Sequence, residues 1–209
     1  MEAPAPRRTR IQREKREVIL EAALEVFSAH GFRGSTIDQI AEQAAMSKPN
    51  LLYYFRRKED IHAALMQRLL DTWLQPLREL DAGGDPLAEL GAYISRKLEM
   101  ARDFPRESRL FANEILQGAP RIMPMLEGEL KTLVDEKAAV IEGWMRAGRL
   151  VRADPCHLIF SIWATTQHYA DFDVQVRAVL GEGRGGDSRF EDAARFLRQL
   201  FVEGLKPKS

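Results

Sequence analysis

The sequence predicts an all-α fold, with a short N-terminal domain of three helices and a longer helical domain after it. Apolar residues recur at three- and four-residue intervals along nearly the whole chain, which is the period of one face of a helix. Residue pairs such as Asp85-Pro86 and Asp154-Pro155 are typical helix starts, because aspartate caps the first turn and proline suits the first helical position. No segment of the sequence shows the alternating pattern of a strand, and none repeats another.

Length and composition exclude several kinds of protein. The 209 residues are 45% hydrophobic and 30% charged, which is typical of a soluble globular chain. Apolar stretches are interrupted by charge well before the roughly 20 residues that a membrane helix needs, and the basic N-terminus lacks the apolar segment of a secretory signal. The single cysteine, Cys156, cannot form an internal disulfide. We therefore expect a cytoplasmic protein with no membrane partner.

Three helices are expected in the N-terminal domain, residues 1–57. The apolar face of the first helix consists of Val18, Ile19, Ala22, Ala23, Val26 and Phe27. This helix is expected to end at Gly31, since glycine readily adopts the left-handed conformation of a C-terminal cap. The second helix covers residues 36–44 and starts with a capping box, because Gln39 follows its first threonine by three residues. A third helix follows over residues 47–55.

The C-terminal domain, residues 58–209, is expected to contain only helices and loops. The predicted helices cover residues 58–77, 86–104, 108–116, 125–147, 155–179 and 190–205. Pro76 is expected to kink the first of them or end it early, because proline lacks a backbone donor. Gly148 is expected to end the long fourth helix, and the glycine-rich residues 181–186 are expected to form a flexible loop.

The two short helices at 36–44 and 47–55, with a tight turn between them, fit a helix-turn-helix. The inner side of the second helix carries Leu51 and Phe55. Its outward positions are those of Lys48, Asn50, Tyr53 and Tyr54. Polar and aromatic groups at the start of such a helix reach base edges and phosphates in the major groove. Spacing alone also fits an ordinary helical hairpin, so the motif needs further support.

Basic residues gather near this motif, although the whole chain balances 31 Lys and Arg against 31 Asp and Glu. One cluster lies in residues 7–16 and includes Arg13 and Arg16, and a second covers residues 56–58. Because phosphate backbones attract local basic patches, a neutral chain can still present a basic face to DNA. A solvated N-terminal tail is the alternative for the first cluster.

The residues of the motif resemble the DNA-binding signature of the TetR family of regulators. The matching runs are GFRGST at 31–36, IAE at 40–42, SKPNLLYYF at 47–55 and KE at 58–59. The resemblance implies that Thr36 and Ser47 cap the two helices at the DNA surface. The residues that it implies for contacts with bases or phosphates are Lys48, Pro49, Asn50, Tyr53, Tyr54 and Lys58. Double-stranded operator DNA is the implied partner.

One position departs from the family pattern. The turn between the two helices usually carries glycine where this chain has Ala45. If Ala45 must adopt a positive φ, the strain costs on the order of 1 kcal/mol, which a helix-turn-helix tolerates.

The rest of the chain resembles one branch of the TetR family, the regulators of pyrimidine use. The similarity lies in residues 70–80, 97–109 and especially 157–172, and it covers nearly the whole chain apart from the N-terminal tail and the loop at 181–187. It implies that uracil or thymine is the effector and that the target genes concern pyrimidine metabolism.

The helix over residues 155–170 is the expected wall of a ligand pocket. It contains no Asp, Glu, Lys or Arg, so it is expected to be buried and to favour a small neutral ligand. Gln167 offers an acceptor beside a donor, which complements the imide edge of uracil. Trp73 and Trp163 are positioned to stack on a flat ring, with plain core filling as the alternative. The candidate ligand-binding residues are Trp73, Leu74, Leu77, Phe111, Trp163, Thr166 and Gln167.

A homodimer is expected through the last two long helices, at 155–179 and 190–205. The last helix has an apolar stripe that a lone domain would leave partly exposed: Phe190, Ala193, Ala194, Leu197, Leu200, Phe201 and Leu205. A two-fold axis predicts a palindromic operator, with half-sites about 34 Å apart. The helix at 58–77 would link the two domains, so a ligand near Trp73 would tilt the DNA-reading helices and release the operator.

Three other kinds of protein are the alternatives to this interpretation. A TetR-type repressor for another small neutral or apolar ligand fits the same fold. An enzyme is not supported, because the four histidines are scattered and the sequence has no metal spacing, phosphate loop or nucleophile elbow, so no cofactor is expected either. A non-specific architectural DNA binder would fit the basic charge alone.

Overall fold

The computed structural model describes residues 10–207, and within them every regular element is a helix, which confirms the all-α prediction. Its contacts divide the chain into two compact units, Met1–Leu69 and Leu70–Ser209, which we call the N-terminal unit and the C-terminal unit. The division falls inside helix α4 (Lys58–Arg78), whereas the boundary expected from the sequence, between residues 57 and 58, lies at the start of this helix.

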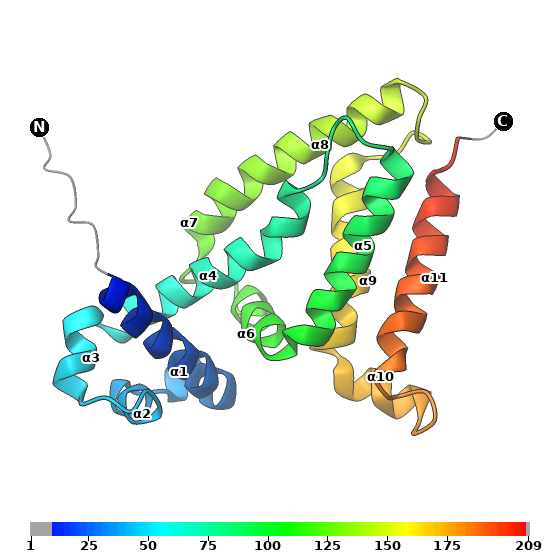
Figure 1. Ribbon diagram of the computed structural model, residues 1–209. Coiled ribbons are helices and arrows are strands. Elements are labelled where there is room, and N and C mark those ends of the chain that lie inside the picture. Colours follow the sequence, from blue (N-terminus) through cyan, green and yellow to red (C-terminus); the bar gives the residue numbers. More distant parts are fainter. Residues whose placement is uncertain (1–9, 208–209) are drawn as a thin grey trace, which may run out of the picture. The chain divides into compact units, whose positions relative to one another are not determined.

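The N-terminal unit consists of α1 (Arg10–Gly34), α2 (Ile37–Gln43), α3 (Lys48–Tyr54) and the first turns of α4 (Figure 1). The apolar faces of these helices form one core, whose fully buried members include Ile19, Leu24, Phe27, Ile40, Leu51 and Ile61. Gly31 interrupts α1 with a φ of 66°, so the first regular stretch of this helix ends where the sequence predicts a left-handed cap.

Side-chain caps define the ends of the two short helices. The Thr36 hydroxyl accepts a hydrogen bond from the backbone N–H of Gln39 at 3.2 Å, and the Gln39 side chain accepts one from the N–H of Thr36 at 2.8 Å. This reciprocal pair is the predicted capping box. Ser47 caps α3 by accepting from the N–H of Asn50 at 3.4 Å. The local sequence therefore determines where each of the two helices of the helix-turn-helix begins.

The turn between α2 and α3 places an alanine in the left-handed region. Ala45 has a φ of 52°, a conformation that costs an L-residue more than it costs glycine. We expect Ala45→Gly to raise the free energy of unfolding of the N-terminal unit by about 0.5 kcal/mol, since glycine removes the strain but gains entropy in the unfolded chain. Urea denaturation followed by far-UV circular dichroism measures this change. The neighbouring Ala44, with a φ of −80°, is the matched control, and Ala44→Gly is expected to destabilise.

The C-terminal unit packs its helices around one large core. Its helices after α4 are α5 (Pro86–Asp103), α6 (Pro105–Leu116), α7 (Met123–Met125), the π-helical segment η1 (Leu126–Leu130), α8 (Lys131–Arg146), α9 (Pro155–Asp171), α10 (Asp173–Leu180) and α11 (Ser188–Leu205). Helix α5 lies between α9 and α11, and the three run side by side (Figure 1). Asp85 and Asp154 cap α5 and α9 as predicted, each with proline in the first turn.

Helix α4 continues through Pro76 to Arg78, close to the predicted range of 58–77, so Pro76 does not end it early. The burial of Leu74 and Leu77 against the core compensates for the missing backbone donor. Helix α6 begins at Pro105 rather than at residue 108, since Phe104 ends α5 and at once precedes the first turn of α6.

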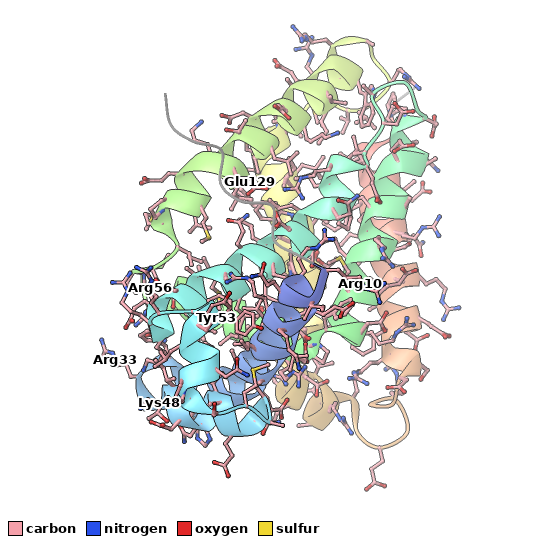
Figure 2. The ribbon with its side chains drawn as sticks, turned by 60° about the vertical axis from the view of Figure 1, so that its left-hand side comes forward. Arg10, Arg33, Lys48, Tyr53, Arg56 and Glu129 are labelled. Atoms are coloured by element: carbon pink, nitrogen blue, oxygen red, sulfur yellow. The ribbon has the colours of Figure 1, made fainter. Side chains whose placement is uncertain are left out.

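Two predicted long helices are interrupted. The stretch expected as one helix over 125–147 begins with η1, whose wider turns shift the register of the side chains. In this segment Glu129, labelled in Figure 2, pairs with Arg78 at the end of α4. The stretch over 155–179 breaks at Phe172 into α9 and α10.

Helix α9 is buried on one side only, although the sequence suggested burial on most sides. Leu158, Ile159 and Ile162 lie in the core, while Phe160 and His168 are exposed. The reason is that α5, α6 and α8 cover one face of α9 within a single chain.

Candidate nucleic-acid interface and ligand cavity

Helix α3 presents its polar start to solvent. Ser47, Lys48, Pro49 and Asn50 are all exposed, and the Tyr53 side chain is 71% exposed one turn later. On the opposite side, Leu51 and Phe55 are buried, as predicted. An exposed helix start with polar side chains above an apolar anchor is the arrangement with which a recognition helix enters the major groove.

Basic side chains surround this helix. Figure 2 shows Arg33, Lys48 and Arg56 along one edge of the N-terminal unit. All three are exposed, and so is Arg13 on α1. Lys48 also forms an exposed ion pair with Asp38 of α2, with 2.9 Å between Nζ and Oδ2, which offsets part of its charge. Arg7 and Arg8 of the predicted basic cluster lie outside the described residues.

Two residues predicted to contact DNA have roles inside the unit. Arg16 donates to the carbonyl oxygen of Tyr54 at 2.9 Å, and its guanidinium lies 3.8 Å from the centre of the Phe55 ring. Lys58 donates to the carbonyl oxygens of Phe32 and Ser35, at 2.8 and 2.6 Å. Arg16 thus holds the end of α3, and Lys58 ties the start of α4 to the segment before α2.

A cavity of about 550 Å³ lies within the C-terminal unit. Its walls come from α6, from η1 and from the second half of α9. The lining residues are Ser108, Arg109, Phe111, Ala112, Asn113, Ile115, Leu116, Leu126, Leu130, Trp163, Gln167, Asp171 and Phe172. Ligand cavities typically have volumes of roughly 300–1,000 Å³, apolar walls and a few polar groups, and this cavity has the same character.

The cavity brings together three of the predicted ligand-binding residues: Phe111, Trp163 and Gln167. The Trp163 indole N–H donates to the hydroxyl of Tyr93 at 2.6 Å, which fixes the orientation of the ring. Burial raises the pKa of Tyr93, so this hydroxyl stays neutral at ordinary pH.

The other four predicted residues are not part of this lining. Leu74 and Leu77 belong to the apolar core. Thr166 is fully buried, and its hydroxyl donates to the carbonyl oxygen of Ile162 at 2.7 Å, so it is bonded to the backbone of its own helix. Trp73 is also buried.

Charged groups at the cavity correct the expectation of an uncharged pocket. Arg109 and Asp171 both line it, with opposite charges, and both lie outside residues 155–170, the helix from which an uncharged pocket was predicted. Ser108 donates to Asp171 Oδ1 at 2.6 Å, and Arg109 donates to the carbonyl oxygen of Ala170 at 3.4 Å. Because the charges balance, a neutral ligand with both donors and acceptors still fits this site.

The final helix leaves its apolar stripe partly exposed, as the sequence predicts, since Leu200 is 52% exposed. Most of the stripe is buried in the unit itself, because this face of α11 packs against α5. Its buried members are Phe190, Ala193, Leu197 and Leu205. Besides Leu200, the exposed large apolar side chains include Phe160 on α9, Phe172, and Phe196 on α11.

A helix-turn-helix unit joined to a helical unit with a cavity is the architecture of a ligand-responsive transcriptional regulator. The family model of bacterial regulatory proteins of the tetR family matches residues 19–65, and that of the YcdC-like protein C-terminal region matches residues 66–208. The chain belongs to the TetR family, whose members bind operator DNA and small ligands and are dimeric. It is thereby a DNA-binding regulator and not an enzyme.

Relatives support the same assignment over the whole chain. The chain is 47% identical over 202 residues to the HTH-type transcriptional regulator RutR of Escherichia coli K12, covering 97% of this chain and 95% of RutR. The fold is also that of Salmonella enterica GusR, at 21% identity and a TM-score of 0.65 over 92% of this chain and 95% of that one. AibR in complex with isovaleryl coenzyme A and operator DNA matches at 17% identity and a TM-score of 0.67, over 89% and 97% of the two chains.

No helix within residues 10–207 has the length and apolarity needed to cross a bilayer.

Proposed function

We propose that this protein is a cytoplasmic homodimer that binds a palindromic operator near genes of pyrimidine metabolism and releases it when uracil or thymine enters the cavity. The observation that carries this proposal is the pairing of Trp163 and Gln167 on one wall of the cavity. They lie four residues apart on α9, so both project from the same side of the helix. The strong resemblance to RutR supports a shared effector.

The chemistry of the walls suits a pyrimidine base. The flat indole of Trp163 offers a stacking surface, and the Gln167 carboxamide offers an acceptor beside a donor. Arg109 and Asp171 add a second donor and acceptor at the polar part of the cavity. Phe111, Leu126 and Leu130 supply apolar contact for a ring. A larger acyl ligand would leave these polar groups without partners, and each such loss costs free energy.

Helix α4 provides the connection to the DNA-binding unit. Its first turn is tied down by Lys58 within the N-terminal unit, and its last turns carry Trp73 and Leu77 in the C-terminal unit. Because one continuous helix belongs to both units, a ligand that shifts its last turns also moves its first turns. In a dimer, a small tilt of each α3 changes the distance between the two α3 helices. That distance then no longer matches the half-site spacing of about 34 Å.

A DNA-binding titration tests the proposal. An operator duplex is first selected from a random pool, and its affinity is then measured by fluorescence anisotropy with and without saturating uracil or thymine. We expect either base to weaken operator binding at least about tenfold, the size of a typical allosteric coupling. Gln167→Ala is expected to need about tenfold more effector, because one polar pair is lost.

The matched control is Gln75→Ala, which removes a glutamine that bonds to Glu79 outside the cavity. This variant is expected to respond to uracil like the wild type. An operator affinity that neither base changes would contradict the pyrimidine assignment. A thermal-shift screen with apolar compounds would then identify the alternative, a repressor for another small ligand.

A further inference from the structure

An acidic side chain lies beside the exposed start of α3. Asp38, in the first turn of α2, accepts a hydrogen bond from the ammonium group of Lys48, with 2.9 Å between Oδ2 and Nζ. Lys48 is the first residue of α3, and both side chains are exposed, Asp38 by 66% and Lys48 by 49%. Because the first residues of a recognition helix meet the base edges, the carboxylate enters the major groove together with the ammonium group.

The charge of Asp38 is opposite to that of its surroundings. Arg33, Lys48 and Arg56 make this edge of the N-terminal unit basic (Figure 2), and a basic surface attracts the phosphates of any DNA sequence. A carboxylate on the same surface repels phosphates and loses water when it enters the groove. This cost is offset only where a base donates a hydrogen bond to the carboxylate. Asp38 therefore weakens binding to most sequences and can distinguish among them.

We propose that Asp38 and Lys48 together recognise one base pair in each half-site of the operator. Lys48 donates to the keto oxygen of one base, and Asp38 accepts from the amino group of the opposite base. In a G·C pair these groups are O6 of guanine and N4 of cytosine, which lie about 2.9 Å apart because they share a hydrogen bond. That separation matches the 2.9 Å between Nζ and Oδ2. The inference rests on the proposed function, because it presupposes an operator and names a base pair by which it is selected.

The two side chains have enough donors and acceptors for this contact. An ammonium group has three N–H donors, and a carboxylate accepts through both of its oxygens. The bond between Lys48 and Asp38 uses one donor and Oδ2, so the other donors and Oδ1 can face the bases. The same bond restricts the long lysine side chain before DNA binds, which lowers the entropy cost of ordering it.

The contact has a direction along the base pair, so it predicts an order of preference. With the keto base on the side of Lys48, a G·C pair fits best, because N7 of guanine is a second acceptor for the ammonium group. A T·A pair presents a keto oxygen and an amino group in the same order, but thymine lacks the second acceptor. C·G and A·T pairs reverse the order, so that an amino group meets the ammonium and a keto oxygen meets the carboxylate. These two pairs are therefore disfavoured.

Base preferences of the full-length protein test the inference. An operator is selected from a random pool of duplexes, and the base pair at each position is then replaced, in both half-sites, by the other three. Competition measured by fluorescence anisotropy gives the relative affinities. At one position the wild type is expected to bind G·C most tightly and C·G at least about tenfold more weakly. Asp38→Ala is expected to lose most of this preference, at that position alone, because no carboxylate meets the bases.

Glu42→Ala is the matched control, because Glu42 is also exposed on α2 and its removal changes the net charge equally. It is expected to keep the wild-type order of base pairs at every position. The exchange variant, Asp38→Lys with Lys48→Asp, is expected to prefer C·G over G·C, a result that partial unfolding cannot produce.

Two results would overturn the inference but leave the proposed function standing. One is a folded Asp38→Ala protein with the wild-type preference at every position, and the other is a uniform change in its affinity for all sequences. Wild-type protein that selects no operator from the pool would contradict both the inference and the proposed function.

Discussion

Phe55→Ala is expected to unfold the N-terminal unit under conditions in which the C-terminal unit stays folded, and to abolish operator binding. Phe55 is 3% exposed, ends α3 and lies under the guanidinium of Arg16. Removing a buried aromatic ring typically costs about 3–5 kcal/mol, and the contact with Arg16 is lost as well. A unit of this size buries a smaller fraction of its surface than a large domain does, so its free energy of unfolding is small.

Two optical probes separate the transitions of the two units. All three tryptophans, Trp73, Trp144 and Trp163, lie in the C-terminal unit. In urea denaturation, Phe55→Ala is therefore expected to show an early transition by circular dichroism that tryptophan fluorescence does not detect. Coincident transitions at the wild-type midpoint would show that Phe55 does not anchor α3.

Tyr53→Ala provides the matched comparison on the same helix. Its side chain is 71% exposed, so the free energy of unfolding is expected to change by less than about 0.5 kcal/mol. Operator affinity is expected to fall about tenfold, because Tyr53 lies on the exposed side of the helix that is predicted to enter the major groove. The two variants thus separate the loss of the fold from the loss of a contact.

Lys97→Met is expected to stabilise the C-terminal unit by on the order of 3 kcal/mol near pH 6, in the absence of any effector. The pKa of Lys97 is about 7 in the folded protein, against 10.5 for an ordinary lysine. The unfolded chain therefore binds more protons between these values, so the stability of the wild type rises with pH across this window. Below pH 7 both states are protonated, and the full cost of burying the ammonium remains.

Urea denaturation monitored by tryptophan fluorescence from pH 6 to pH 10 measures this effect. The difference between Lys97→Met and the wild type is expected to shrink as the pH rises, because the wild-type lysine becomes neutral in the folded state. Two stability profiles that run parallel over this range would show that Lys97 is not a buried titrating group. Lys137→Met, which removes a hydrogen-bonded lysine, is expected to leave the pH profile unchanged.

The helix-turn-helix could be predicted residue by residue because its determinants are local. The caps at Thr36 and Ser47 and the left-handed Gly31 each depend on groups within a few residues, so the sequence contains all the necessary information. The glycine that the family pattern carries at the position of Ala45 also indicated where a positive φ could occur, and Ala45 has one. The same reasoning could not assign partners to Arg16 and Lys58, which bond to carbonyl groups distant in the sequence.

The cavity was predicted less completely because its walls come from separate helices. Trp163 and Gln167 share one face of α9, so their proximity follows from helical periodicity. Asp171 and Ser108 come together only when α6 and α9 pack, and no spacing along the chain predicts that. Periodicity likewise located an apolar stripe on α11 without revealing that it faces the core of its own unit.

The sequence by itself determined the all-α class, the ends of the two DNA-binding helices and the exposed start of α3, since capping and periodicity act over one or two turns. Tertiary structure alone decided which polar groups reach the cavity, where α4 is shared between units and which face of α11 stays exposed. The physical reason is that burial and the electrostatic environment depend on which helices pack together, and helices distant in the sequence determine both.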